Sequence, residues 1–70
     1  MERLLRADQA AKVLNISTRS VYRLAGEGNF VCLKVGGSLR ITEQSVNKYI
    51  RSKIQEYYLN NGNYPDNHAR

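Results

Sequence analysis

Apolar residues recur at two different spacings along this chain, one typical of helices and one typical of strands. Four of them at helical spacing predict a first helix over residues 7–14: Ala7, Ala10, Ala11 and Leu14. Asn15, which tolerates left-handed backbone geometry, ends that helix. A second set at i, i+3, i+4 spacing predicts a second helix: Val21, Leu24 and Ala25. Ser17 opens this helix as a hydroxyl cap, and it ends near Gly26 in a cluster of helix breakers.

Two strand-like runs follow, over residues 30–35 and 38–41. Gly36-Gly37 lies between them and supplies the positive φ angles of a tight hairpin turn. Alternation along each run predicts that four apolar side chains face the core: Leu33, Val35, Leu39 and Ile41. Lys34 and Arg40 then point outward together, on one face of the ribbon. A hairpin that only closes the core, with both charges solvated, is the alternative.

A third helix begins behind Thr42, whose hydroxyl caps it, and Glu43 complements the helix dipole in the first turn. An apolar stripe carries this helix to about Leu59: Val46, Tyr49, Ile50, Ile54, Tyr57 and Tyr58. The first half of the stripe must close the core over the first two helices. A domain this small has little surface left to cover the second half.

The order of these elements predicts a known arrangement. Two helices separated by a few residues, the first rich in alanine, form a helix-turn-helix, and a hairpin behind the second helix is a wing. We therefore expect an α+β fold, a small winged helix-turn-helix of three helices with a two-stranded β-hairpin wing between helices two and three. It occupies residues 1–60, and residues 61–70 form a flexible polar tail. An ordinary helical hairpin is the alternative for the first two helices.

The chain is strongly basic, and the charge lies in the predicted fold and not in the tail. Eleven Lys and Arg against six Asp and Glu give a net charge of +5 and a pI near 9.7, which is typical of proteins that bind nucleic acid. No apolar run approaches a membrane-spanning length, so we expect a soluble protein of the cytoplasm. The single Cys32 excludes an intramolecular disulfide and a cysteine-based zinc site, and is most simply a small buried strand residue.

The outward face of the second helix carries residue types that bind DNA. Its candidate contacts are Ser17, Thr18, Arg19, Ser20, Tyr22 and Arg23. Arg19 and Arg23 lie one turn apart, and a planar guanidinium reads O6 and N7 of guanine or binds phosphate. We expect Arg19 at a base edge and Arg23 at a base or the backbone. On the wing, five residues can reach the DNA backbone or minor groove: Lys34, Gly36, Gly37, Ser38 and Arg40.

Catalytic chemistry has no comparable support in the sequence. His68, the only histidine, lies in the polar tail with no serine, cysteine or acid placed to form a dyad. Neither Gly26-Glu27-Gly28 nor Gly36-Gly37 belongs to a phosphate-binding loop, because neither has the required glycine spacing before a helix. We therefore expect a protein that is not an enzyme and that needs no metal or cofactor.

The order and spacing of these motifs resemble the excisionase-type helix-turn-helix family, a compact relative of the MerR winged-helix DNA-binding domain. The resemblance spans roughly Leu4 to Ile50 and rests on six segments: Leu4-Leu5, 10–14, 17–24, Gly28, Lys34-Val35-Gly36 and Arg40-Ile41. Members are excisionases (recombination directionality factors), phage or plasmid regulators of the AlpA kind, and DNA-binding modules of larger regulators. The family frequently has basic residues where this chain has Gly37-Ser38, which implies a weaker grip of the wing tip on phosphate.

The resemblance implies an excisionase that binds and bends double-stranded DNA at attachment sites, self-associates cooperatively there, and directs a site-specific integrase toward excision. A small transcriptional regulator with the same domain is one alternative. A protein–protein adaptor that uses the long third helix is an alternative of another class. Within that helix, we expect Ile54, Tyr57 and Tyr58 to contact a partner, either a second copy on adjacent DNA or a recombinase. The other interpretation folds the tyrosines back onto Leu4 and Leu5.

Overall fold

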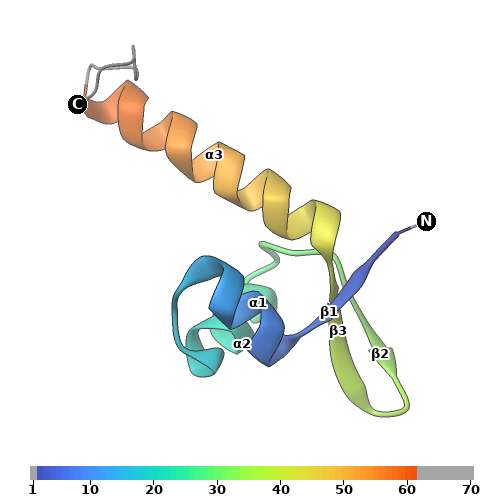
Figure 1. Ribbon diagram of the computed structural model, residues 1–70. Coiled ribbons are helices and arrows are strands. Elements are labelled where there is room, and N and C mark those ends of the chain that lie inside the picture. The colour runs from blue at the N-terminus through green and yellow to red at the C-terminus, as the bar shows by residue number, and fades with distance from the viewer. Residues whose placement is uncertain (1, 62–70) are drawn as a thin grey trace.

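Three helices and one antiparallel sheet build the protein, in a computed structural model that describes residues 2–61. The elements follow one another as β1 (Leu4–Arg6), α1 (Ala7–Leu14), α2 (Thr18–Gly26), β2 (Cys32–Val35), β3 (Ser38–Thr42) and α3 (Glu43–Asn61). Helices α1 and α2 lie together on one side of the sheet, while α3 leaves the far end of β3 and extends away from the body (Figure 1). The α+β winged helix-turn-helix is therefore confirmed. The predicted tail over 61–70 lies, apart from its first residue, outside the described residues.

The helix-turn-helix forms with the predicted ends. Asn15 takes the left-handed conformation, with φ 58°, and its N–H donates to the Lys12 carbonyl oxygen over 3.2 Å. At the start of α2, Ser17 Oγ accepts from the Ser20 N–H over 3.1 Å, which satisfies one of the amides that a helix leaves unpaired. Ala10 is fully buried, and its small side chain lets α1 and α2 approach closely. Caps and close packing together hold α2 in place.

Helix α1 begins without a hydroxyl cap. Arg6 occupies the cap position, and the side-chain oxygen of Gln9 accepts a hydrogen bond from the Arg6 N–H over 2.9 Å. That reciprocal half of a capping box still fixes the first turn. The helix therefore starts at Ala7, directly where β1 ends.

The sheet contains one strand more than the hairpin that the sequence predicts. Its order is β1-β3-β2, with β3 in the centre and antiparallel to both neighbours. Leu5 of β1 pairs with Ile41 of β3, and both side chains are buried. The apolar pair before the first helix is thus a strand that ties the N-terminal segment to the wing.

The hairpin has a different register from the one that alternation predicts. Gly36 and Gly37, with φ 58° and 87°, form a two-residue turn, so Val35 pairs with Ser38 and Cys32 pairs with Ile41. Directly paired residues share a face of the sheet, and here an odd position always faces an even one. The prediction that Leu33 and Val35 face the core is therefore wrong: their exposed fractions are 42% and 48%.

The two wing charges are affected by the same register. Lys34 pairs with Leu39, whereas Arg40 pairs with Leu33. Leu39 and Arg40 are neighbours along β3 and point to opposite faces of the sheet, so Lys34, which pairs with Leu39, lies on the face opposite to Arg40. The prediction that Lys34 and Arg40 share one face of the ribbon is therefore wrong. Lys34 is exposed and Arg40 is half-buried.

Eight buried side chains form the core: Leu5, Ala7, Ala10, Ala11, Val21, Phe30, Ile41 and Val46. Phe30 packs edge-to-face against Tyr49 of α3, with ring centroids 5.2 Å apart. The Thr42 hydroxyl caps α3 as predicted, since its Oγ1 accepts from the Ser45 N–H over 3.2 Å. Ile50 is the last residue of α3 that packs against this core, so the first half of the helix closes the domain.

Candidate nucleic-acid interface

Helix α2 presents one apolar and one polar face, as its sequence predicts. Val21 is fully buried, while Thr18, Arg19, Tyr22 and Arg23 are all exposed. These residues form two neighbouring pairs, Thr18-Arg19 and Tyr22-Arg23. The pairs lie one helical turn apart, so the four side chains occupy a continuous outward surface. An α-helix with this kind of face fits the major groove of B-form DNA, where arginine and hydroxyl groups reach base edges.

At the N-terminus of α2 the two predicted serines are already engaged with each other. Ser17 Oγ lies 3.0 Å from Ser20 Oγ, in addition to the capping bond from the Ser20 N–H. This arrangement fixes the first turn of α2. Thr18, which lies beside the two serines, makes no hydrogen bond through its hydroxyl to another described residue. Thr18 also borders the hollow described below.

The two arginines of α2 differ in their surroundings. Arg23 Nη1 lies 3.5 Å from Glu27 Oε2, an exposed i, i+4 ion pair that the sequence analysis overlooked. The spacing alone could have shown it. Arg19 makes no ion pair or hydrogen bond within residues 2–61, so its guanidinium is available to a ligand. Exposed pairs of this kind are weak, and Arg23 can exchange Glu27 for a DNA group at small cost.

A hollow of about 360 Å³ separates α2 from the hairpin. Its walls come from three parts of the fold: Arg6 at the start of α1, Thr18 and Tyr22 of α2, and Lys34 and Arg40 of the hairpin. Tyr22 is 54% exposed and borders the hollow from the side of α2. The hollow therefore joins the predicted recognition helix and the predicted wing into one surface.

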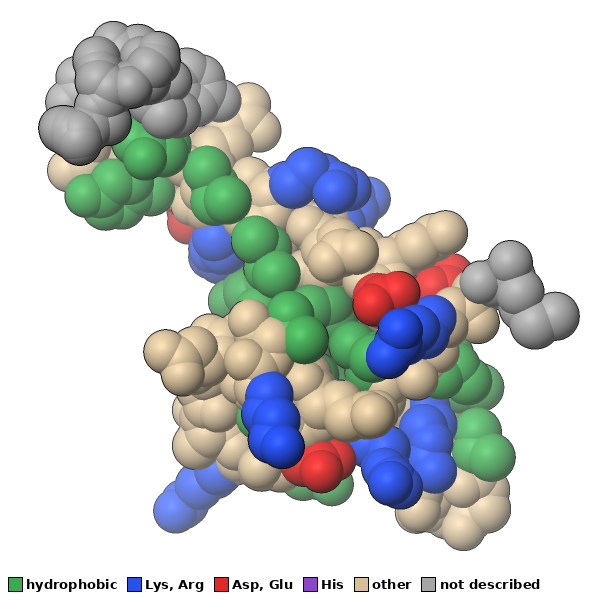
Figure 2. All heavy atoms as spheres, in the orientation of Figure 1, with side chains coloured by type: hydrophobic (Ala, Val, Ile, Leu, Met, Phe, Trp, Pro, Cys, Tyr) green, Lys and Arg blue, Asp and Glu red, His purple; other side chains and the backbone are tan. Residues whose placement is uncertain are grey.

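The charge of this hollow is predominantly positive. Arg6, Lys34 and Arg40 line it together with a single acidic residue, Asp8. Figure 2 shows basic side chains gathered beside the hairpin and next to α1. Arg40 Nη1 donates to the Leu39 carbonyl oxygen over 3.1 Å, which directs its guanidinium along its own strand. Although the register places Lys34 and Arg40 on opposite faces, both border the same hollow, where β1 ends.

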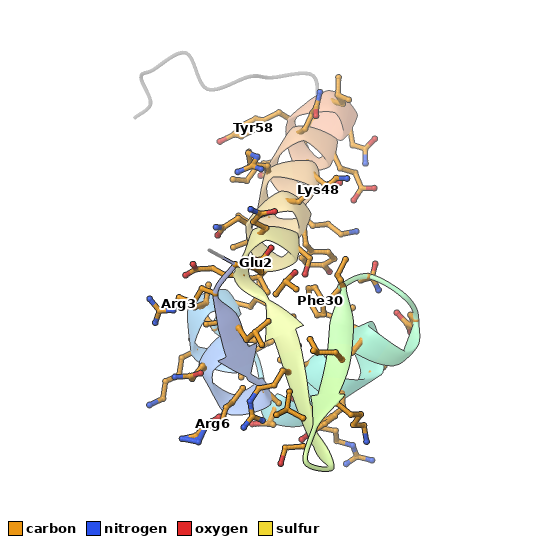
Figure 3. All side chains as sticks on the ribbon, turned by 90° about the vertical axis from the view of Figure 1, so that its right-hand side faces the viewer. Glu2, Arg3, Arg6, Phe30, Lys48 and Tyr58 are labelled. Carbon is orange, nitrogen blue, oxygen red and sulfur yellow. The ribbon has the colours of Figure 1, made fainter. Side chains whose placement is uncertain are left out.

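Arg6 is the contact candidate that sequence reasoning missed. It precedes α1 by one residue, far in sequence from both α2 and the wing, and only the pairing of β1 with β3 brings it to the hollow. Figure 3 shows Arg6 toward the hairpin end of β1, whereas Arg3 lies toward α3. No spacing within the sequence signals that contact.

At the wing tip, Gly36 and Gly37 adopt the left-handed φ angles that the tight turn requires, with no heavy atom within 4 Å of an added Cβ. Gly37 and Ser38 border the hollow. All three predicted tip residues are exposed. Backbone N–H groups in an open turn can approach a phosphate closely, where side chains would hold it off.

The predicted partner surface lies on the outer half of α3. Ile54 and Tyr57 are 49% and 61% exposed, and Tyr57 packs edge-to-face on the half-buried Tyr58 at 5.2 Å. Together with Leu14 of α1, these residues line an apolar hollow of about 400 Å³. The alternative that folds the tyrosines onto Leu4 and Leu5 is wrong, because those leucines lie in β1 and α3 leads away from it (Figure 1).

The arrangement of α1, α2 and the β2–β3 wing defines a small winged helix-turn-helix domain. A family model described as a helix-turn-helix domain matches residues 4–54, from β1 to the middle of α3. The chain belongs to this family and is a DNA-binding helix-turn-helix protein. No curated protein and no solved structure matches the chain significantly. No helix within residues 2–61 is long and apolar enough to cross a membrane.

Proposed function

We propose that this protein is an excisionase, a recombination directionality factor that binds attachment-site DNA in the cytoplasm and has no enzymatic activity of its own. Helix α2 enters the major groove, where Arg19 reads a base edge, and the hairpin meets the adjacent backbone. The observation that carries this proposal is the continuous basic surface formed by the exposed face of α2 and the hollow beside it. Support for the recombination role comes from the resemblance of residues 4–50 to excisionases.

The geometry favours bending of the bound DNA. The recognition residues of α2 and the basic residues of the hairpin lie on either side of one hollow, so the two can contact adjoining segments of a duplex. A duplex that curves toward the hollow contacts both, and the additional backbone contacts offset the elastic cost of bending. An excisionase uses such bending to bring an integrase to an attachment site in its excisive arrangement.

Footprinting on the DNA that flanks the protein's own gene tests the first step. We expect discrete protected sites, and Arg19→Ala should weaken binding to them by about 1–3 kcal/mol, the value of one bidentate base contact. Arg51→Ala is the matched control, because Arg51 is an exposed arginine of α3 outside the basic surface. No protection on any duplex would favour the adaptor function instead.

An excision assay tests the second step. A plasmid that carries the pair of attachment sites overlapping the footprint is incubated with the corresponding integrase, with and without this protein. We expect excision to require the protein and to be lost with Arg19→Ala. If the footprints instead fall in a promoter, and the protein changes transcription but not excision, it is a transcriptional regulator.

Cooperative self-association on DNA is the third part of the proposal, with a second copy seated on the apolar surface of α3. That surface is predominantly apolar, and it continues from Tyr49 and Ile50, which pack against the core. Truncation after Lys53 and the substitution Tyr57→Ser should leave single-site affinity unchanged and reduce cooperativity on paired sites. Loss of the melting transition in both variants would assign these residues to folding instead.

A further inference from the structure

Two arginines lie side by side on adjacent strands of the sheet, where β1 ends. Arg6, the last residue of β1, pairs directly with Arg40 of β3. Side chains of such partners lie on one face about 5 Å apart at Cβ, and like charges placed there destabilise a sheet. The neighbouring pair, Leu5 with Ile41, is buried and apolar. The repulsion between the arginines therefore has no compensation within the sheet itself.

Neither arginine is neutralised by a carboxylate. The ion pairs within residues 2–61 are Arg3 with Glu43, Arg23 with Glu27, and Lys53 with Glu56. Arg6, Arg40 and Lys34 form none, although all three border one hollow. Asp8 is the only acid there. An anion bound between the arginines would relieve their repulsion, so the electrostatics of the hollow favour a negatively charged ligand.

The remaining lining suits a phosphate group. Thr18 and Tyr22 bring hydroxyl donors to the same hollow, and both belong to the helix that enters the groove. Guanidinium groups bind phosphate oxygens with charge-assisted hydrogen bonds, two at a time where the geometry allows. We propose that Arg6 and Arg40 together hold one backbone phosphate of the bound duplex, at the hollow between α2 and the hairpin.

This phosphate clamp rests on the proposed DNA-binding mode and adds to it a fixed point between helix and wing. Contacts to phosphate set the position of a protein on a duplex without reading its sequence. The clamp would place α2 at a defined depth in the groove, and it supplies a charged backbone contact, which the uncharged tip, Gly37-Ser38, lacks. Arg6 is then a positioning residue, whereas Arg19 determines specificity.

Neutralising single phosphates tests the clamp. A duplex with one binding site is prepared as a series, each member with one methylphosphonate, and titrated with the wild type, Arg6→Gln and Arg3→Gln. We expect Arg6→Gln to weaken binding by about tenfold on cognate and noncognate duplexes alike, as for a lost charge-assisted hydrogen bond. The wild type should also lose affinity at one methylphosphonate position to which Arg6→Gln is insensitive. Arg3→Gln removes the same charge from the same segment and should behave as the wild type.

The possible outcomes separate the clamp from the proposed function. If the wild type binds no duplex, the DNA-binding mode fails, and the clamp with it. If the wild type binds and Arg6→Gln matches Arg3→Gln at every methylphosphonate, the clamp alone is wrong. A loss with Arg6→Gln that depends on base sequence would show that Arg6 reads bases, which also overturns the clamp. Inorganic phosphate that raises the melting temperature of the wild type, with no methylphosphonate effect, would assign the hollow to free anions instead.

Discussion

The salt dependence of DNA binding tests the proposed interface most directly. In the proposed binding mode, three phosphate contacts come from Arg23, Lys34 and the Arg6–Arg40 clamp, and Arg19 adds a fourth if it binds the backbone instead of a base. Each neutralised phosphate contributes about −0.9 to the slope of log K against log salt, so the slope should lie between about −2.7 and about −3.6. Raising salt from about 50 mM to about 200 mM should then weaken binding between about 40-fold and about 150-fold.

Fluorescence anisotropy with a labelled single-site duplex measures this slope. Lys34→Ala should reduce its magnitude by about 0.9, because one phosphate contact is lost. Arg51→Ala should leave the slope unchanged, since Arg51 lies on α3 outside the basic surface. A fall of less than about tenfold over the same salt range would refute the count of contacts. If Lys34→Ala and Arg51→Ala changed the slope equally, DNA binding would depend on the net charge of the protein and not on contacts between particular residues and phosphates.

Two further predictions concern the sheet and α2. Ile41→Ala should destabilise the domain by about 2–5 kcal/mol, because Ile41 is fully buried, whereas Leu33→Ala should cost less than about 1 kcal/mol. Thermal unfolding of both variants measures this, and equal losses would contradict the observed register. Glu27→Gln should tighten DNA binding by up to about fivefold, because it releases Arg23 and removes a carboxylate near phosphate. Weaker binding of that variant would show that Glu27 itself contacts a base.

The helices were predictable because their signals are local. The i, i+3, i+4 spacing of apolar residues, a hydroxyl at Ser17 and a left-handed residue at Asn15 lie within a few residues of the elements that they define. The exposed face of α2 followed directly from that periodicity. Strand β1 was not predictable in the same way, because three residues are too few to show alternation. It forms only because β3 offers a free edge to Leu5.

The basic hollow depends on contacts between distant residues. Arg6 and Arg40 are far apart in sequence, and their pairing follows from the β1–β3 register. A sequence pattern without the third strand cannot place Arg6 beside the wing. By contrast, the ion pair of Arg23 with Glu27 has a local i, i+4 spacing and was available to sequence reasoning. The exposed face of α2 was therefore predicted, and the hollow that joins it to the wing was not.

The hairpin register was also determined by the sequence, through its turn. A two-residue turn at Gly36-Gly37 pairs Val35 with Ser38, and every pair before it then joins an odd with an even position. Leu33 cannot share a face with Ile41 under this constraint, whatever its hydrophobicity. Turn length thus decides the register, and the apolar side chains of β2 remain on the outer face, at 42% exposure for Leu33.

Cys32 provides a chemical test of that register. It pairs with Ile41, its side chain is half-buried, and burial raises the pKa of its thiol. Because the thiolate is the reactive form, a raised pKa means less thiolate at any pH below it, so reaction with a disulfide reagent at mildly alkaline pH should be slower than in denaturant. The difference should narrow as the pH rises through the pKa of the folded protein. Moving the thiol to the outer face with Leu33→Cys in a Cys32→Ala background should restore a rate close to that of the unfolded chain. If the two thiols react equally fast in the folded protein, Cys32 does not face the core, and the odd–even pairing across the Gly36-Gly37 turn is incorrect.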